Sequence, residues 1–278
     1  MTVAKALREA TARLASTSDT ARLDAELLMA HALGVTRSEL LLRHQQEAAP
    51  PPFAALVERR ERHEPVAYIV GSKEFYGREF LVAPGVLIPR MDSETTLAAA
   101  LEAVPAARRV LDCGVGSGAL LLTVLAEMPA AEGIGIDRSA EALEIASANA
   151  EQLGLAERTR LLRRDWDQPG WVADLGRFDL VLANPPYVED DAPIAATVRE
   201  WEPEGALFAG PDGLDACRML IPQLSGLLAD GGAAVVEIGA SQAGQVTEIA
   251  ARAGFTSELR RDLGGRPRAL VLRLTLGK

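Results

Sequence analysis

The pattern of apolar and polar residues changes along the chain, and its first part is typical of short helices. In "TSDTARLDAELLMAHALG" (17–34), polar residues able to cap a helix precede an apolar run, and Gly34 provides a stop. The apolar positions expected on the inner side of this helix are Leu23, Leu27, Leu28 and Met29. Further short helices are expected over "TRSELLLRH" and behind the prolines of "PPPFAALVERRERHE". This pattern predicts a small helical bundle, which could dock a partner or only stabilise the chain.

From residue 73 the apolar positions alternate instead of recurring at helical spacing. "KEFYGREFLV" alternates around Tyr76-Gly77, and "GVLIPR" follows a Pro-Gly turn. Alternation on both sides of a tight turn predicts a β-hairpin that acts as a linker.

Beyond the linker, apolar strands alternate with amphipathic helices. Strands are expected in "RRVLDCG" (108–114), "GIGID", "RTRLLRRDW", "FDLVLANPPY", "AAVVEIG", "SELRRDL" and "RALVLRL". Helices are expected in "SGALLLTVLAEM", "SAEALEIASANAEQLG", "GLDACRMLIPQLSGLLADGG" (213–232) and residues 241–253. Strand–helix units of this length predict an α/β fold with a doubly wound, seven-stranded, mainly parallel sheet, whose ligands bind at the carboxyl ends of the strands. The last two strands are joined only by "GGRP" and should pair antiparallel.

The length of 278 residues exceeds the usual size of one compact core. We therefore expect three parts: a helical domain at 1–72, the hairpin linker at 73–90 and the α/β domain at 91–278.

The net charge of −10 is carried by the larger part of the chain, since residues 1–80 are balanced in charge. Proteins that bind nucleic acid usually show a basic stripe. The segment "RTRLLRR" (158–164) is better interpreted as a strand with flanking charges. The charge distribution therefore disfavours DNA or RNA as substrate.

Cysteine usage and the N-terminal segment favour a cytoplasmic protein. The chain has two cysteines, Cys113 and Cys217, no CxxC pair and three histidines, which indicates reduced thiols and no structural metal. The segment "MTVAKALREATARL" lacks the apolar core of a signal peptide, and no run approaches the roughly 20 apolar residues of a membrane span.

A glycine-rich turn follows the first strand of the α/β domain. "VLDCGVGSG" places Asp112 at the strand end and Gly114, Gly116 and Gly118 in the turn, where the backbone can approach a ligand closely. The G-x-G-x-G spacing differs from the G-x-G-x-x-G of dinucleotide sites. A nucleoside cofactor, a dinucleotide and a purely structural turn all remain open on this motif alone.

Acidic residues at neighbouring strand ends narrow these alternatives. Asp137 ends the next strand, where a carboxylate can accept from both hydroxyls of a ribose. Asp165-Trp166 follows the third strand and could border an adenine, although Trp166 is equally suited to the core. Asp112 is unfavourable beside phosphates and favourable beside an ammonium or sulfonium group. The acidic lining therefore favours a cationic nucleoside cofactor.

The segment "VLANPPYVED" (181–190) ends the fourth strand abruptly. Pro185 and Pro186 cannot donate ladder hydrogen bonds, so the strand stops at Asn184. The Asn184 side-chain oxygen and the Pro185 carbonyl could hold the two hydrogens of a planar NH2 group, and Tyr187 could stack on it. We predict Asn184, Pro185 and Tyr187 as catalytic residues, with Pro186 completing the substrate-binding set.

The segment alone does not identify which planar NH2 group binds at this site. Adenine amino groups and glutamine amides both offer a planar NH2, and each is a poor nucleophile because its lone pair is delocalised. The acidic sequel "VEDDAP" favours a protein acceptor.

Residues 108–275 resemble the class I S-adenosylmethionine-dependent methyltransferases. Nearly the whole chain resembles the release-factor glutamine methyltransferases, the PrmC/HemK family. The resemblance is carried by the helical N-terminal region, "EPVAYIVGSKEFYGREFLVAPGVLIPR", "DCGVGSG", "DRSAEAL", "RDW", "NPPY", "WEPEGALFAGPDGLD" and "DLGGRPRALVLR".

The resemblance implies methylation of the glutamine amide in the Gly-Gly-Gln motif of class 1 peptide chain release factors, with S-adenosylhomocysteine as product. It implies that the N-terminal domain docks the release factor and that Asn184 to Tyr187 hold the glutamine, without a metal, a nucleic-acid substrate or a membrane. A site built within one chain is compatible with a monomer. The cofactor contacts expected from the motifs and the resemblance together are Asp112, Gly114, Val115, Gly116, Ser117, Gly118, Asp137, Asp165, Trp166 and Asn184.

One segment departs from the family pattern. After "IPR", the family usually continues with Pro-Glu-Thr-Glu/Asp, whereas this chain has Met91-Asp92-Ser93-Glu94. Arg90 is a candidate loop contact to the cofactor, and the missing proline concerns the shape of this loop. Three alternatives stay open: a methyltransferase acting on a glutamine of a ribosomal protein, an adenine amino methyltransferase, and a binding module without activity.

Overall fold

The computed structural model describes residues 1–275. Its internal contacts divide the chain into two compact units. The first consists of Met1–Ser72 together with Ile194–Glu202, and the second consists of Lys73–Pro193 and the chain from Pro203 onward. The return of Ile194–Glu202 to the N-terminal unit was not part of the predicted three contiguous parts.

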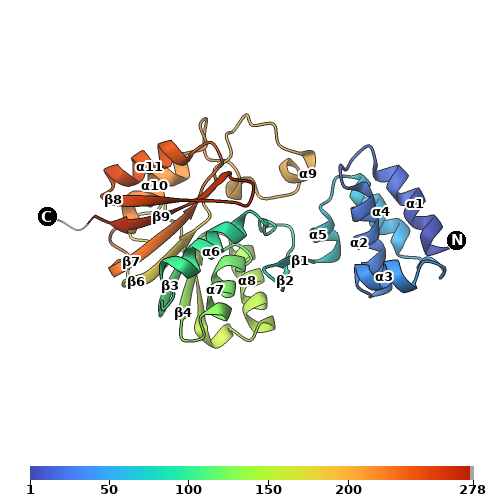
Figure 1. Cartoon of the computed structure of the whole chain (residues 1–278), viewed down its shortest axis with the longest axis horizontal. Coiled ribbons are helices and arrows are strands. Elements are labelled where there is room, and N and C mark those ends of the chain that lie inside the picture. The colour runs from blue at the N-terminus through green and yellow to red at the C-terminus, as the bar shows by residue number, and fades with distance from the viewer. Residues whose placement is uncertain (276–278) are drawn as a thin grey trace. The chain divides into compact units, whose positions relative to one another are not determined.

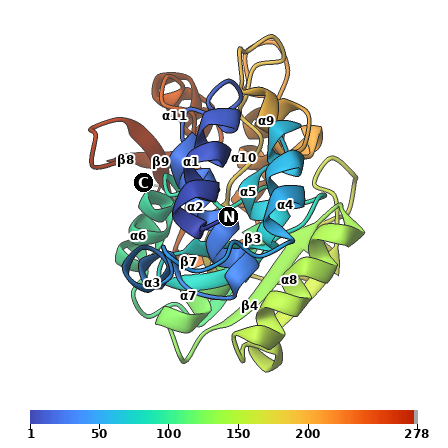
Figure 2. The same cartoon turned by 90° about the vertical axis from the view of Figure 1, so that its right-hand side faces the viewer.

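The N-terminal unit is a helical bundle, as predicted. Its elements are α1 (Val3–Leu14), α2 (Ala21–Leu33), α3 (Arg37–Arg43), α4 (Phe53–Glu61), α5 (Val66–Val70) and, from the returning segment, α9 (Ala196–Arg199). Figure 2 shows α1, α2 and α4 side by side. A capping box between Thr36 and Glu39 starts α3, and Gly34 ends α2 in the left-handed region with φ 67°.

The predicted inner side of α2 is partly wrong. Leu28 and Met29 are buried, but Leu23 and Leu27 are exposed. Asp24 and Glu26 are buried in their place because both carboxylates have arginine partners. Asp24 accepts from Arg60 at 2.7 Å, and Glu26 accepts from Arg22 and Arg37 at 2.8 and 2.7 Å.

The segment Ile194–Glu202 is held in this unit by hydrogen bonds from distant parts of the sequence. The Arg60 guanidinium donates to Thr197 Oγ1 at 3.3 Å, and the Trp201 indole N–H donates to the Arg62 carbonyl at 3.2 Å. Such contacts between residues far apart in sequence leave no periodic signal in the pattern of apolar positions.

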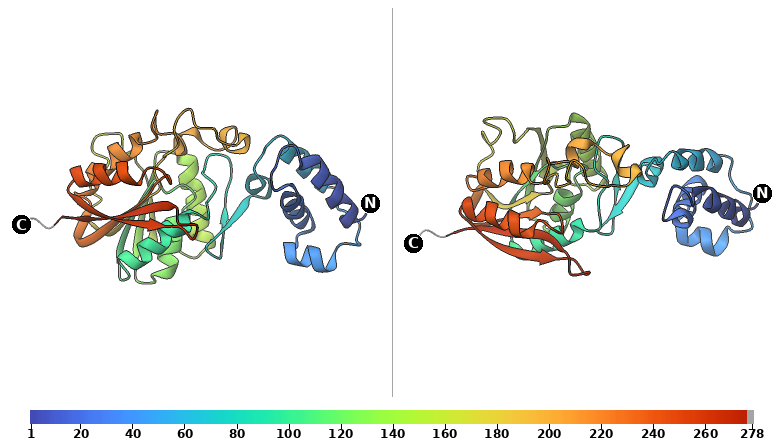
Figure 3. Two further views of the ribbon diagram at one scale, coloured as in Figure 1. Left: turned by 45° about the horizontal axis from the view of Figure 1, so that its top comes forward. Right: turned by 90° about the horizontal axis from the view of Figure 1, so that it is seen from above.

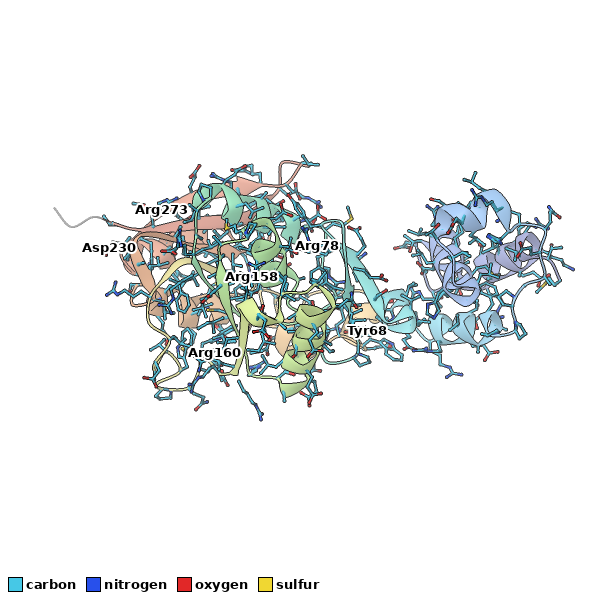
Figure 4. The ribbon with its side chains drawn as sticks, turned by 90° about the horizontal axis from the view of Figure 1, so that it is seen from below. Tyr68, Arg78, Arg158, Arg160, Asp230 and Arg273 are labelled. Atoms are coloured by element: carbon cyan, nitrogen blue, oxygen red, sulfur yellow. The ribbon has the colours of Figure 1, made fainter. Side chains whose placement is uncertain are left out.

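A two-stranded hairpin follows the helical bundle and begins the second unit. β1 (Ser72–Phe75) and β2 (Arg78–Leu81) flank Tyr76 and Gly77, which both have positive φ (49° and 72°), as a type I′ turn requires. The hairpin prediction is confirmed, although "GVLIPR" forms no strand. Arg78, labelled in Figure 4, pairs with Glu127 at 2.6 Å and thereby fixes β2 to the rest of the second unit.

The second unit contains a seven-stranded sheet in the order β5-β4-β3-β6-β7-β9-β8 (Figure 1). The strands are β3 (Arg109–Cys113), β4 (Glu132–Asp137), β5 (Thr159–Arg163), β6 (Phe178–Ala183), β7 (Leu228–Glu237), β8 (Phe255–Arg261) and β9 (Pro267–Leu274). The first five pair in parallel, whereas β9 runs antiparallel to both β7 and β8. The predicted doubly wound fold is therefore confirmed, and β9 inserts between β7 and β8.

Helices cover both faces of this sheet (Figures 1 and 3). α6 (Ser93–Ala103), α7 (Ala119–Glu127) and α8 (Ala140–Gln152) cover one face, and α10 (Asp215–Leu224) and α11 (Ala243–Arg252) cover the other. Short 3-10 turns lie at Ala156–Arg158 and Glu204–Ala206. Along β6, Leu180 and Leu182 belong to one core cluster and Val181 and Ala183 to the other. Burial on both faces explains the continuous apolar run of this strand.

One helix is shorter than predicted. The pattern indicated a helix over 213–232, but α10 ends at Leu224. Leu228 is already the first residue of β7, where it pairs with Phe178 of β6. Pro222 and Gly226 weaken helical structure here, and pairing with β6 decides the conformation of the following residues.

No helix among residues 1–275 is both long enough and apolar enough to cross a membrane.

A buried asparagine on α8 joins the hairpin to the glycine-rich turn. Asn149 Oδ1 accepts from the Leu81 N–H at 2.7 Å, and Nδ2 donates to the carbonyls of Leu81 and Ser117 at 3.0 and 2.8 Å. The side chain is completely buried, so all three hydrogen bonds are shielded from water.

We predict that Asn149→Ala lowers the free energy of unfolding by about 3 kcal/mol, because it leaves buried backbone groups without partners. Denaturant titration measures this loss. Gln152→Ala on the same helix is the matched control, since it removes a single exposed hydrogen bond to the Glu79 carbonyl. Equal, small losses in both variants would contradict the assigned role of Asn149.

Candidate functional site

A cavity of about 730 Å³ opens at the carboxyl ends of β3, β4, β5 and β6. This volume is in the range of sites that hold small-molecule ligands. Its walls come from the glycine-rich turn, the ends of the neighbouring strands, the "VLIPR" segment, residues 203–210 and the start of α10. The location is the switch point of the sheet, where β3 has β4 on one side and β6 on the other.

The glycine-rich turn after β3 is fixed by backbone hydrogen bonds. Gly114 and Val115 both donate to the Ile136 carbonyl at 2.9 Å, and Gly116 donates to Asp137 Oδ2 at 3.0 Å. Gly114 has φ 86°, and a Cβ there would lie 3.1 Å from the Trp166 ring. The site therefore requires glycine at 114 for backbone conformation and for close approach of Trp166.

Asp112 lies at the base of the cavity and is almost completely buried, with 1% of its surface exposed. Its Oδ1 atom has no hydrogen-bond partner among the described residues. Burial, then the nearby Asp137 carboxylate, raise the pKa of Asp112 to about 7, while the Leu121 backbone N–H lowers it. An unpartnered buried acceptor beside a cavity fits a ligand that brings a cation.

Asp137 and the Asp165-Trp166 pair end the next two strands. Asp137 Oδ1 accepts from the Ser139 N–H at 3.0 Å, so both carboxylate oxygens of Asp137 also hold backbone groups of the surrounding turns. Trp166 is half-buried, lines the cavity and packs against the core beneath it. The two interpretations of Trp166 given by the sequence are therefore compatible with one position.

Most of the predicted site residues line this one cavity: Arg90, Asp112, Gly114, Val115, Gly116, Ser117, Asp137, Asp165, Trp166, Asn184 and Pro186. Gly118, Pro185 and Tyr187 are not among its lining residues. Gly118 starts α7, where its carbonyl accepts from Leu122, and it has φ 86°. Pro185 is buried, whereas Asn184 and Pro186 are partly exposed.

Asn184 enters the cavity because of the register of β6. Ala183 pairs with Cys113 of β3 and with Val236 of β7, so Asn184 follows β6 at the level of Gly114 and Glu237. None of the described residues forms a hydrogen bond with its side-chain amide, which leaves that group available to a ligand.

Tyr187 is half-buried, and charged groups lie near its phenol. Burial and then the Glu237 carboxylate raise the pKa of Tyr187 to about 12, so the phenol is protonated at neutral pH. The Tyr187 carbonyl accepts from Gln242 Nε2 at 3.0 Å. Direct stacking of Tyr187 on a substrate stays a prediction.

The segment from Pro203 to Gly210 forms a wall of the cavity, although the sequence motifs did not predict it as part of the site. Arg138 Nη2 donates to the Gly205 carbonyl at 2.9 Å, and a Cβ at Gly205 would collide with the same guanidinium. Val188 donates to the Leu207 carbonyl at 2.8 Å, which joins this wall to the segment after Asn184. The "WEPEGALFAGPDG" run was the available signal.

The departure from the family pattern at Met91 leaves an ordered loop. Met91 is 75% exposed, whereas Asp92 pairs with Arg268 at 2.6 Å. Ser93, which begins α6, lines the cavity. The substituted position thus points to solvent, and the neighbouring residues are held by the protein.

The described residues contain no group of three or more His, Cys, Asp or Glu side chains placed to hold a metal ion.

Two family models match the chain. The model described as PrmC N-terminal domain matches residues 5–71, and the model described as Methyltransferase small domain matches residues 79–201. The second match includes the glycine-rich turn and Asn184.

The chain is also similar to whole proteins. It is 42% identical to the release factor glutamine methyltransferase of Cereibacter sphaeroides over 99% of each chain. It is 41% identical to that of Caulobacter vibrioides, covering 98% of this chain and 96% of the relative. Among solved structures, a methyltransferase from Pyrococcus furiosus aligns with TM-score 0.51 and 16% identity over 72% of this chain and 90% of that one, a likeness of fold alone. With this similarity over nearly its full length, the chain belongs to the family of release factor glutamine methyltransferases.

Proposed function

We propose that this chain transfers a methyl group from S-adenosylmethionine to the side-chain amide of the glutamine in the Gly-Gly-Gln motif of class 1 peptide chain release factors. The observation that carries the proposal is the near full-length identity of about 40% to release factor glutamine methyltransferases. The position of Asn184 on the cavity wall agrees with it.

The residues around the cavity fit S-adenosylmethionine. When bound, it supplies a methyl group activated by a sulfonium cation. We assign Asp112 to the ammonium group. Its buried Oδ1 atom has no hydrogen-bond partner among the described residues, and Asp112 lies on the cavity wall just before the glycine-rich turn. Asp137 is assigned to the ribose, and Asp165 with Trp166 to the adenine. Gly114 to Gly118 form the turn around which these groups are arranged, with Gly118 acting through the start of α7.

The acceptor side of the cavity is assigned to Asn184 and the prolines after it. The Asn184 oxygen can accept from one hydrogen of the glutamine amide, and Pro185 is expected to accept from the other. Holding both hydrogens directs the nitrogen toward the methyl group, and positioning of this kind lowers the barrier by reducing the entropy lost in the reaction. Tyr187 is half-buried and is assigned to keep this segment in place.

The N-terminal unit is assigned to docking of the release factor. Its match to the PrmC N-terminal domain model supports this role. A monomeric state and a cytoplasmic location stay predictions.

We expect Asn184→Ala to reduce kcat about 100-fold or more, because the amide loses one of its two orienting acceptors. Methyl transfer to a purified release factor is measured at saturating cofactor. The affinity for S-adenosylmethionine, measured by calorimetry, should change little. Undiminished turnover would show that Asn184 does not orient the acceptor.

The substrate class is tested by incubating the protein with labelled S-adenosylmethionine and, separately, a release factor, ribosomal proteins, tRNA, rRNA and DNA. Label is expected on the release factor and should vanish when its motif glutamine is replaced. Stronger labelling of ribosomal protein or nucleic acid would instead favour one of the alternatives that the sequence left open.

Asp112 gives a prediction for pH dependence. Since the carboxylate must be ionised to pair with a cation and its pKa is about 7, cofactor affinity should increase from about pH 6 to about pH 8. In Asp112→Asn, affinity at pH 8 should be about tenfold weaker or more, and this pH dependence should be lost. Calorimetric titration at several pH values measures both effects.

The stability of the ligand-free protein provides the control. The pKa of Asp112 is raised from 3.8 by folding, so its favourable contribution to stability is present in acid and is lost as pH rises to about 7. Asp112→Asn should therefore be no less stable than the parent at pH 8. A weak affinity that merely accompanied unfolding would contradict the assignment.

A further inference from the structure

A buried polar cluster lies beside the Asn184–Tyr187 segment, and the proposed mechanism makes no use of its carboxylate. This Glu237 cluster consists of Glu237, Ser93, Thr96, Arg268 and Tyr187. Its members come from β7, α6, β9 and the segment after β6, which are far apart in sequence.

Glu237 is the last residue of β7 and has only 1% of its surface exposed. Val236 pairs with Ala183 in β6, so Glu237 lies at the level of Asn184. On its other side Glu237 pairs with Ala269 of β9. The carboxylate thus belongs to the strand next to the one that ends at the proposed acceptor site.

Two hydroxyl groups of α6 hold this carboxylate. Thr96 Oγ1 donates to Glu237 Oε2 at 3.0 Å, and the Ser93 side chain also forms a hydrogen bond to Glu237. Ser93 lines the cavity, whereas Thr96 is completely buried. Glu237 therefore connects the cavity wall at Ser93 with the carboxyl edge of the sheet.

Charged side chains near Glu237 act in opposite directions on its ionisation. Arg268 from β9 favours its ionised form, while Asp92 at the start of α6 opposes it. Arg268 is itself held by Asp92 at 2.6 Å and Asp262 at 3.0 Å. The phenol of Tyr187 is close enough to Glu237, Arg268, Arg90 and Asp92 for their charges to shift its pKa.

Stability alone does not account for this carboxylate. Burial raises the pKa of Glu237 to about 7, against the opposing effects of the two hydroxyls and Arg268. An ionised carboxylate at this depth costs free energy relative to a neutral residue of the same size. Its location beside the acceptor segment suggests a function in return for that cost.

We propose that Glu237, in its ionised form, is a positioning residue for methyl transfer: it fixes Ser93 at the cavity wall and Tyr187 behind it, and thereby holds Asn184 toward the acceptor. This inference rests on the proposed function. Glu237 acts through Ser93 and Tyr187 and takes no part in bond making or breaking.

The ionised form matters because of the hydrogen-bonding pattern. A carboxylate accepts from both Ser93 and Thr96, whereas a protonated carboxyl has one oxygen that is itself a donor. Protonation would turn one acceptor oxygen of Glu237 into a donor, so a hydroxyl that donates to this oxygen would have to rotate and accept instead, and the cluster would rearrange.

The experiment measures kcat at saturating S-adenosylmethionine and release factor between about pH 6 and pH 8. For a group with a pKa of about 7, kcat of the parent protein should increase about tenfold over this range. Saturation with cofactor separates this effect from that of Asp112, which acts on affinity. In Glu237→Gln, kcat at pH 8 should fall about tenfold and be nearly independent of pH, with cofactor affinity retained.

Asp179→Asn is the matched control. Its carboxylate accepts from the Arg108 and Arg109 N–H groups, both at 2.9 Å, at the opposite end of β6. This variant removes a carboxylate from β6, the strand next to β7, at a position that does not line the cavity. Its kcat should therefore keep the pH dependence of the parent. Ser93→Thr, which keeps the hydroxyl, should likewise retain the profile, and Ser93→Ala should lower kcat.

A readout without catalysis accompanies these assays. Folding raises the pKa of Glu237 from 4.5 to about 7, so its contribution to stability is lost as pH rises through this range. Relative to the parent, Glu237→Gln should therefore gain thermal stability from about pH 5 to about pH 8.

Turnover by Glu237→Gln with the parent's kcat and pH profile would overturn the inference. So would a loss of kcat explained entirely by a smaller folded fraction. Absence of transfer by the parent protein would instead overturn the proposed function, and this inference with it.

Discussion

The parallel pairing of β3 with strands on both sides determines where the functional groups meet. Asp112 of β3 lies level with Gly135 of β4 and Leu182 of β6. The glycine-rich turn, Asp137 and Asn184 therefore leave the sheet at one edge, although the chain between the first and last of them exceeds a typical supersecondary unit. The cavity depends on this register, because a shift by one residue would turn each of these side chains to the other face.

Two buried carboxylates lie at this edge of the sheet, one on the cofactor side and one on the acceptor side of the proposed site. Asp112 is next to the glycine-rich turn, and Glu237 is next to the acceptor segment; each has a pKa of about 7. Both groups make the ligand-free protein less stable at alkaline pH than in mild acid. The same burial makes each charge effective, since solvent screening is weak there. On this account, stability is given up at two positions where a cation and an oriented amide have to be held.

The sequence was sufficient for the features that depend on local pattern. The glycine-rich turn, the hairpin at Tyr76-Gly77 and the proline-terminated strand at Asn184 all have short signatures with a backbone cause. The alternation of strands and helices predicted the sheet, and the short connection between the last two strands predicted their antiparallel pairing. The position of β9 between β7 and β8 is known only from the structure.

Features that depend on long-range contacts could not be predicted in this way. Glu237 is a single acid at the end of an apolar strand, and only folding brings Ser93 and Thr96 to it. The same reason explains the error in α2, where arginines distant in sequence or on the outer face stabilise buried acids at positions expected to be polar and exposed. The wall at 203–210 depends on Arg138, more than sixty residues earlier.

The most direct test of the account is mass spectrometry of a release factor after incubation with this protein and S-adenosylmethionine. The account predicts a mass increase of one methyl group on the peptide that contains the Gly-Gly-Gln motif, located by fragmentation to the glutamine side chain. An unmodified glutamine after incubation with folded, cofactor-binding protein, or a methyl group on any other residue, would contradict it.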